Sequence, residues 1–363
     1  MAVKTKAKGP SALARGEERT ALWLLLPSFL IIAIVAVYPL GRVVMSSFTN
    51  ERFAAGAELR GEFVGLQNYR QLLSLTLRVV PQRLDAEGQP VFENGRPVYE
   101  SDRLFLRQLD TPLRYDTVNT FDAFGNRYVL GASSARFIRA VWDTLVFTVS
   151  SVALETILGM IIALTLAAKF IGRGVMRAAM LVPWAIITVV SARIWEWMMQ
   201  STRAGFFNTF LTDLGVIDAP IAFFQTASLQ VPAMVMIDVW KTTPFMALLL
   251  LAGLATIPTE LYEAAEVDGA GPLRRFFSIT LPLLTPTLAV ALIFRTLDAL
   301  RVFDLFQVVY GEARYSMASY AYYQLIAARN VGMSAAASVV IFVVIFVFAI
   351  LYIRALGVER DGD

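Results

Sequence analysis

The 363-residue sequence contains no cysteine and no histidine. Without cysteine there are no disulfides and no thiol nucleophiles, and without histidine there is no imidazole base. Together the two absences remove the usual ligands of structural and catalytic zinc. The sequence therefore predicts no catalytic residues and no metal site, and it argues against hydrolytic or redox chemistry as the role of the chain.

Lysine and net charge are also low. The lysines are Lys4, Lys6, Lys8, Lys169 and Lys241, and none of them follows a glycine. A phosphate-binding loop of the form GxxxxGK[ST] requires that pair, so the chain cannot be its own ATPase. The net charge is only +3 and the arginines are scattered, which leaves no basic stripe for a nucleic acid. Active transport would thus need a partner subunit or an ion gradient.

Apolar residues, in contrast, are abundant and clustered. Hydrophobic residues make up 57% of the chain and charged residues 17%. The apolar residues gather in runs of about 20, the length that crosses a bilayer as a helix. The sequence predicts an all-α integral membrane protein. We expect six transmembrane helices, at residues 21–41, 140–168, 176–199, 230–255, 282–306 and 335–354.

Basic residues near the ends of these runs predict the orientation. The segment 1–20 is basic, and its hydrophobic run is longer than that of a typical cleaved signal peptide, which is the alternative. Short loops and the end of the chain carry Lys169, Arg173, Arg177, Arg274, Arg275, Arg354 and Arg360. Both termini, including the tail 358–363, are therefore expected on the cytoplasmic side of the cell's inner membrane.

The segment 42–138 separates the first two predicted helices. It contains turn-rich strings, such as AEGQPVFENGRPVYE with Asn94-Gly95 as a hairpin signal, and short β-like runs such as RYVLGASS. Helical periodicity is lacking, while aromatic and β-branched residues recur. We expect a small, mostly β extracytoplasmic insert; the alternative is a disordered insertion.

The polar segment 256–281 lies between two apolar runs, so it must be an ordered loop at a membrane face. Pro258 suits the start of a helix, and Gly269 suits the left-handed residue that ends it. Pro272 can begin a second helix. Ala264 and Ala265 would allow a partner backbone to approach closely. The segment predicts a docking element, with a merely polar linker as the alternative.

The loop resembles the EAA loop of ATP-binding-cassette (ABC) importer permeases, in which a short helix pair inserts into a groove of the ATPase subunit. The resemblance rests on Glu263, Ala264, Ala265, Gly269, Ile279, Leu281 and Pro282. It implies that Glu263 and Asp268 contact or order the ATPase interface and that Gly269 shapes the turn. The chain would be a permease core, residues 139–357, of the binding-protein-dependent type.

Two further strings, DVWKTTPFMALLLLAGL and FRTLDALRVFDL, resemble the carbohydrate branch of these permeases, especially those for maltose, trehalose and similar α-glucosides. The insert resembles the extra periplasmic domain of the larger maltose permease subunit. The resemblance implies four kinds of partner: a second, related permease subunit that is a distinct polypeptide, two ATPase subunits that bind ATP and Mg, a sugar-binding protein and the sugar. One departure is VYGEARYSM, where relatives commonly have a Gly-Gly-Pro turn.

Ionisable residues inside predicted helices usually face a cavity, so they indicate a substrate pathway. One face of the fourth helix carries a carboxylate, an ammonium, a hydroxyl and an aromatic ring, a combination that suits a sugar. The candidate pathway residues are Asp238, Lys241, Thr242, Phe245, Asp298 and Arg301. Candidate ion-pair residues are Arg193, Glu196 and Arg295. Pairing that only holds the bundle together, including Asp238 with Lys241, is the alternative.

Two other functions remain to be weighed. A sugar transporter driven by an ion gradient would use the same carboxylates as ion sites, but it leaves the polar loop unexplained. A membrane-bound enzyme such as a glycosyltransferase would need an acid, base or metal cluster. Asp85, Glu87 and Asp102 in the insert have no spacing that suggests one.

Overall fold

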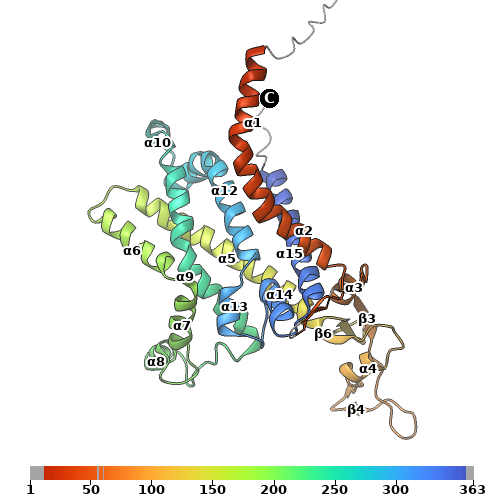
Figure 1. Cartoon of the computed structure of the whole chain (residues 1–363). Helices are drawn as coiled ribbons and strands as arrows, with labels where there is room; N and C mark the ends of the chain where they lie inside the picture. The colour runs from red at the N-terminus through yellow and green to blue at the C-terminus, as the bar shows by residue number, and fades with distance from the viewer. Residues whose placement is uncertain (1–11, 55–56, 60, 357–363) are drawn as a thin grey trace, which may run out of the picture.

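The computed structural model describes residues 12–54, 57–59 and 61–356. The lysines predicted to mark the cytoplasmic N-terminus, Lys4, Lys6 and Lys8, lie outside the described residues, as do Arg360 and the tail 358–363. In Figure 1 a helical bundle occupies most of the molecule, with the insert at one end and the loop carrying α10 (Thr259–Val267) at the opposite end.

Five helical runs in the described part are long and apolar enough to cross a membrane: Thr20–Ser46, Ala135–Ala167, Ala227–Leu254, Pro272–Val309 and Val331–Arg354. The first run comprises α1 (Ala12–Ile32), the π-helix η1 (Ala33–Val37) and α2 (Tyr38–Ser46). The next two are α5 (Ala135–Ala167) and α9 (Ala227–Leu254), and the last lies in α15 (Val331–Leu356). The fourth run comprises α11 (Pro272–Arg275), η2 (Phe276–Thr280), α12 (Leu281–Leu300) and α13 (Asp304–Val309).

The predicted third span, 176–199, is not one helix. It consists of α6 (Arg173–Ala185) and α7 (Thr188–Met198), whose axes are bent by 93°. Ile186 and Ile187 have extended backbone angles, with ψ of 134° and 137°, and separate the two helices. An apolar run does not reveal such a break, because both halves remain hydrophobic. α8 (Phe206–Asp213) follows α7.

The predicted fifth span, 282–306, also needs correction. The long helix α12 ends at Leu300, and Arg301 leaves helical geometry with ψ of 10°. The backbone NH of Arg301 bonds to the carbonyl of Asp298, which closes the last turn. Asp304 therefore begins the separate helix α13 and does not continue the face of Arg301. α14 (Met317–Ile326) follows before α15.

Both π-helical segments precede a proline. Proline lacks an NH, and its ring clashes with the carbonyl four residues earlier in an α-helix. For Pro39 that carbonyl belongs to Val35 in η1, and for Pro282 it belongs to Ser278 in η2. The wider π turn relieves this clash without ending the helix. The chain therefore stays helical through Pro282, from α11 at the end of the loop into α12.

The insert is mostly β, with two short helices that the sequence did not predict. Its elements are β1 (Arg52–Ala54), β2 (Ala57–Leu59), α3 (Gln67–Leu73), β3 (Leu75–Val79), β4 (Phe92–Glu93), β5 (Arg96–Pro97), α4 (Asp102–Gln108), β6 (Asp116–Ala123) and β7 (Asn126–Ala132). Strands β3, β7 and β6 form an antiparallel sheet in that order. Val80, Leu106 and Val129 form its buried core. Asn94 and Gly95 both have positive φ, 51° and 76°, as the predicted hairpin turn between β4 and β5 requires.

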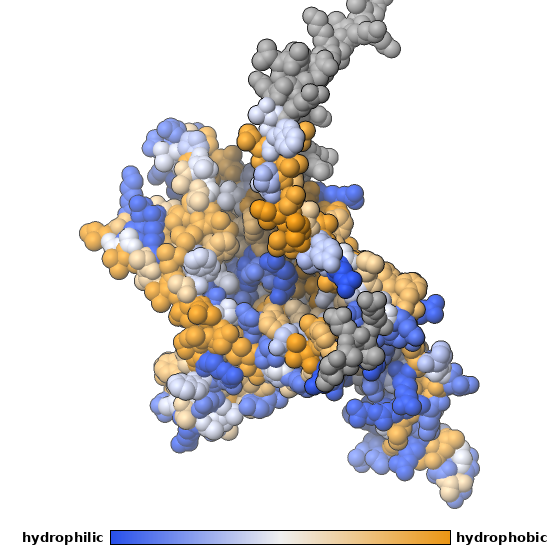
Figure 2. Space-filling view, viewed as in Figure 1, coloured by the Kyte–Doolittle hydropathy of each residue, from blue (hydrophilic) through white to orange (hydrophobic). Residues whose placement is uncertain are grey.

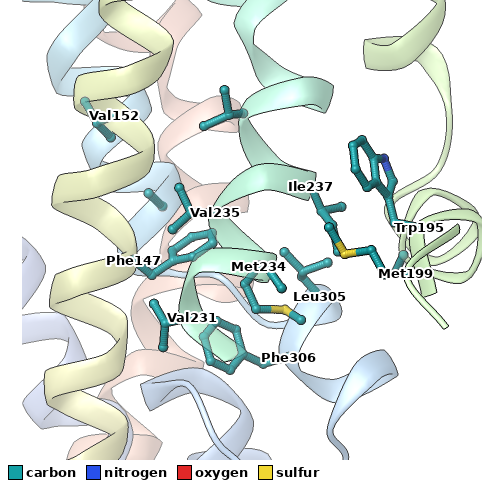
Figure 3. Close-up of a cluster of buried hydrophobic side chains, with 14 residues drawn as sticks. Phe147, Val152, Trp195, Met199, Val231, Met234, Val235, Ile237, Leu305 and Phe306 are labelled. Atoms are coloured by element: carbon teal, nitrogen blue, oxygen red, sulfur yellow. The ribbon is translucent and has the colours of Figure 1, made fainter. Parts of the chain in front are cut away.

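A cluster of buried apolar residues ties α7, the second helix of the bent pair, to the bundle. Figure 3 shows Phe147 of α5, Met234 of α9, Trp195 of α7 and Phe306 of α13 in one cluster. The rings of Phe147 and Phe306 meet edge to face, 5.7 Å between centroids. α13 is therefore held against α5 and α9 although it continues beyond the end of α12.

Large apolar side chains also cover the outside of the bundle. Hydrophobic residues dominate the surface over the helices in Figure 2, whereas the insert is largely hydrophilic. None of the membrane-spanning window of the first helical run is buried. Exposing so large an apolar surface to water would be energetically unfavourable, whereas contact with the acyl chains of lipid would not. The distribution indicates a chain that spans a membrane several times.

Gly159 sets the contact between α5 and α9. A Cβ at this position would lie 2.8 Å from Met246 Cγ and 3.2 Å from the backbone N of Ala247. We expect Gly159→Val to destabilise the protein by about 1–3 kcal/mol through overpacking. Thermal unfolding in detergent measures the effect. Gly174→Val is the matched control, because no atom lies within 4 Å of a Cβ there; an equal loss in both variants would contradict the assigned contact.

Candidate functional site

A buried charge cluster joins three helices in the middle of the bundle. Arg295 of α12 is 3% exposed, and Glu155 of α5 is fully buried. Arg295 Nη2 donates to Glu155 Oε1 at 2.9 Å, and its Nε donates to the other oxygen of the same carboxylate. Nη2 also donates to Asp238 of α9, and Nη1 donates to Asp298 at 2.9 Å. One guanidinium thus donates hydrogen bonds to three carboxylates.

The cluster has a closed end and an open end. Glu155 has no exposed surface, whereas the side chain of Asp298 is 64% exposed. Thr242 Oγ1 lies 2.5 Å from Glu155 Oε1 and 2.6 Å from the carbonyl of Asp238, and its single proton serves one acceptor at a time. Three carboxylates facing one arginine leave hydrogen-bond acceptors in excess. Hydroxyl donors of a ligand would complement this surplus at the open end.

The remaining predicted pathway residues lie around this cluster. Arg301 Nη2 is 3.9 Å from Asp298 Oδ1, a weak contact between two exposed side chains. Phe245 stacks on Trp184 of α6, with centroids 5.9 Å apart and ring planes within 8°. Lys241 forms no ion pair with any described residue. The alternative pairing of Asp238 with Lys241 is wrong, because Asp238 pairs with Arg295.

The pair on the bent helices is separate from the cluster. Arg193 Nη1 donates to Glu196 Oε2 at 2.6 Å, one turn along α7. The side chain of Arg193 is 60% exposed and that of Glu196 is 35% exposed. An exposed pair of this kind contributes little to stability. Arg295, in contrast, belongs to the buried cluster itself.

Sequence reasoning missed two parts of this polar framework. Glu155 was not singled out, although a carboxylate in an apolar run is itself the signal of a functional or paired position. Asp143 of α5 was also missed. Its two oxygens accept from Arg314 Nη2 and Nε at 2.6 Å each, and Arg314 Nη1 donates to Gln230 Oε1 at 2.5 Å. Arg314 lies in the segment that departs from the usual Gly-Gly-Pro turn and ties that segment to α5 and α9.

The α10 loop is ordered at the opposite end of the bundle from the insert. Pro258 is the residue before α10, Gly269 ends the turn after it with φ of 75°, and α11 begins at Pro272. The Tyr262 hydroxyl is 2.9 Å from Thr280 Oγ1, and Arg275 Nη1 donates to Glu266 Oε2 at 3.0 Å. These contacts hold α10 against α11 and η2.

The outer surface of this loop mixes acidic, small and apolar residues. Glu263, Ala264, Asp268 and Gly269 are exposed, and Ala265 is half-buried. Pro282 is exposed as well, whereas Ile279 and Leu281 are half-buried within the helical run that leads into the bundle. Three apolar side chains of the loop are also exposed: Leu261 by 43%, Val267 by 89% and Leu273 by 77%. Apolar side chains beside small residues favour a protein contact at this surface.

The sequence of the chain is similar to those of known transport permeases. It is 47% identical over 244 residues to the trehalose/maltose transport system permease protein MalF of Thermococcus litoralis, covering 65% of this chain and 81% of that protein. It is 30% identical over 343 residues to the sulfoquinovosyl glycerol transport system permease protein SmoG of Agrobacterium fabrum, covering 93% and 91%.

The fold is similar to a solved chain from a bacterial ABC transporter involved in the import of the acidic polysaccharide alginate. The TM-score is 0.67 and the identity 19%, over 97% of this chain and all of that one, so the likeness concerns the fold alone. The family model for binding-protein-dependent transport system inner membrane components matches residues 128–356. This chain therefore belongs to the family of inner membrane components of binding-protein-dependent transport systems.

Proposed function

We propose that this chain is a permease subunit of an ATP-driven importer for a sugar, most specifically an α-glucoside such as trehalose or maltose. The observation that carries the proposal is the ordered α10 loop, which lies at the end of the bundle away from the insert and exposes Glu263 and Ala264. The 47% identity to a trehalose/maltose permease supports the substrate class. A transporter driven by an ion gradient has no need of this loop, and we do not propose one.

The assembly contains a second, related permease subunit, two ATPase subunits that bind ATP and Mg, and an extracytoplasmic sugar-binding protein. Glu263, Ala264, Ala265, Asp268 and Gly269 form the contact with an ATPase subunit, and Ile279, Leu281 and Pro282 transmit its movement into α12. Both termini and the loop lie in the cytoplasm, and the insert lies outside the inner membrane. The short loops rich in arginine at the α10 end support this orientation.

The translocation pathway runs along Asp238, Thr242, Asp298 and Arg301, with Lys241 and Phe245 beside it. The acceptor-rich open end of the charge cluster suits sugar hydroxyls, and the stacked rings of Phe245 and Trp184 suit the apolar face of a pyranose. Closure of the ATPase subunits upon ATP binding shifts the bundle toward its outward-open state, and hydrolysis reverses the shift. Arg193 and Glu196 pair with each other on α7 and are not part of the pathway.

Reconstitution with the ATPase subunit, partner permease and binding protein tests this function. We expect one of maltose, trehalose or sucrose, but not glycerol phosphate, to stimulate ATP hydrolysis. Glu263→Ala should remove that stimulation or prevent assembly. Phe245→Ala should leave assembly intact and lower sugar uptake roughly tenfold, because the aromatic contact contributes about 1 kcal/mol or slightly more.

Two results would contradict the proposal. The first is wild-type protein that binds no ATPase subunit. The second is uptake that follows an ion gradient without ATP. Thr285→Ala in α12 is the matched control, since its exposed hydroxyl bonds only within its own helix, to the carbonyl of Leu281; it should behave as wild type in both assays.

A further inference from the structure

A cavity of about 710 Å³ lies beside the α10 loop. The ends of α5 and α9, the start of α6 and the start of α10 enclose it, and Thr280 of η2 lies at its wall. Its volume is within the range of small-molecule binding sites. None of Arg295 and its carboxylate partners lines the cavity, and on α5 and α9 the lining begins more than two helical turns beyond Glu155 and Asp238. It is therefore a separate site from the charge cluster.

Two arginines of α6 line the cavity without an acidic partner. Neither Arg173 nor Arg177 forms an ion pair with any residue that the structure describes. Arg177 Nη2 donates to the carbonyl of Leu166 at 3.3 Å, and its Nε is buried with no hydrogen-bond partner in the described part of the chain. An arginine with unused buried donors is suited to a phosphate, which accepts several hydrogen bonds at once.

The rest of the cavity wall is mostly apolar. Leu164, Leu248, Leu251 and Leu254 line it from α5 and α9. The surface beside the arginines is apolar too, with Phe170 41%, Ile171 fully and Val175 75% exposed. Exposed apolar residues next to arginines at the end of a membrane-spanning bundle are typical of the level of lipid headgroups.

We propose that this cavity binds one anionic phospholipid, with its phosphate on Arg173 and Arg177 and an acyl chain along the leucines. A carboxylate of a partner protein would also suit the arginines. The polar backbone of that protein would then lie against the leucines, where burying polar groups is costly. Thr259 and Tyr262 of α10 line the same cavity, so the lipid stabilises the start of the docking loop. The inference does not depend on the sugar or on the ATPase.

The test uses the full-length chain purified in neutral detergent and measures its melting temperature with added lipid. Dioctanoyl phosphatidylglycerol should raise the melting temperature at lower concentration than dioctanoyl phosphatidylcholine. In Arg173→Gln/Arg177→Gln the half-saturating concentration of the anionic lipid should increase roughly 25-fold, because each arginine near a headgroup strengthens binding roughly fivefold. Arg354→Gln, an exposed basic residue in the last turn of α15, is the matched control and should bind as wild type.

A second variant keeps both arginines. Ala252 lines the cavity and is exposed, so Ala252→Trp should fill the apolar part and abolish the shift even if the double variant folds poorly. The proposal is overturned if phosphatidylcholine acts as well as phosphatidylglycerol, or if Ala252→Trp retains the full shift. Inorganic phosphate alone producing the shift would overturn the lipid assignment in favour of a free-phosphate site.

Discussion

Arg295→Met is expected to lower the free energy of unfolding by about 3–5 kcal/mol, since removing one partner of a buried ion pair leaves the other charge without compensation. Here the loss leaves Glu155 and Asp238 together in the bundle interior, with Glu155 fully buried. Thermal unfolding of the purified chain measures the effect. Sugar uptake by the assembly should fall with it, because the same residues position the pathway.

The explanation by uncompensated charge can be separated from a simple packing loss. The triple variant Arg295→Met, Glu155→Gln, Asp238→Asn should recover much of the lost stability, since both buried charges are then neutral. Arg193→Met is the matched control and should cost less than about 1 kcal/mol, because its pair with Glu196 is exposed. Equal losses in the single and triple variants would show that the arginine acts by packing and not by charge.

Gly269→Val is expected to abolish sugar-stimulated ATP hydrolysis in the assembly. Gly269 has φ of 75°, and a β-branched residue in that region costs about 1–3 kcal/mol. The space around it is open, with nothing within 4 Å of an added Cβ, so the effect comes from the backbone and not from a clash. The strained turn would displace α10 relative to α11 and so misplace the docking surface.

Two substitutions serve as controls for this prediction. Asparagine tolerates the left-handed region, so Gly269→Asn should retain most of the stimulation. Gly271 also has open space around it but has φ of −68°, so Gly271→Val should be nearly neutral. If both valine variants lost activity equally, side-chain bulk in the loop would explain the loss, and the role given to the Gly269 turn would be wrong.

The sequence predicted the membrane helices because an apolar run long enough to span a bilayer is a strong local signal. It did not predict the break between Ala185 and Thr188, since an extended link of two isoleucines is as hydrophobic as a helix. For the same reason it extended the fifth helix past Leu300, where the chain turns at Arg301 and continues as the apolar helix α13. In the first place the hydropathy is uniform across the break, and in the second Arg301 and Asp304 interrupt it without marking where the helix ends.

The charge cluster shows a different limit. Asp238, Asp298 and Arg295 each stood out as ionisable residues in apolar helices, and helical spacing suggested the contact between Arg295 and Asp298. The contacts of Arg295 with Glu155 and Asp238 join three helices, and only the packing of α5, α9 and α12 brings them together. Spacing on one helix allowed Lys241 as an alternative partner of Asp238, and that alternative is wrong because Asp238 pairs across helices with Arg295.

Docking of the α10 loop on an ATPase subunit can be tested by site-directed crosslinking. The chain has no cysteine of its own, so Ala264→Cys can be labelled uniquely with benzophenone maleimide and the assembly irradiated. Glu87→Cys, exposed in the insert, is the control. We expect an adduct with the ATPase subunit from position 264 and none from position 87. Complete labelling at 264 without any ATPase adduct would contradict it.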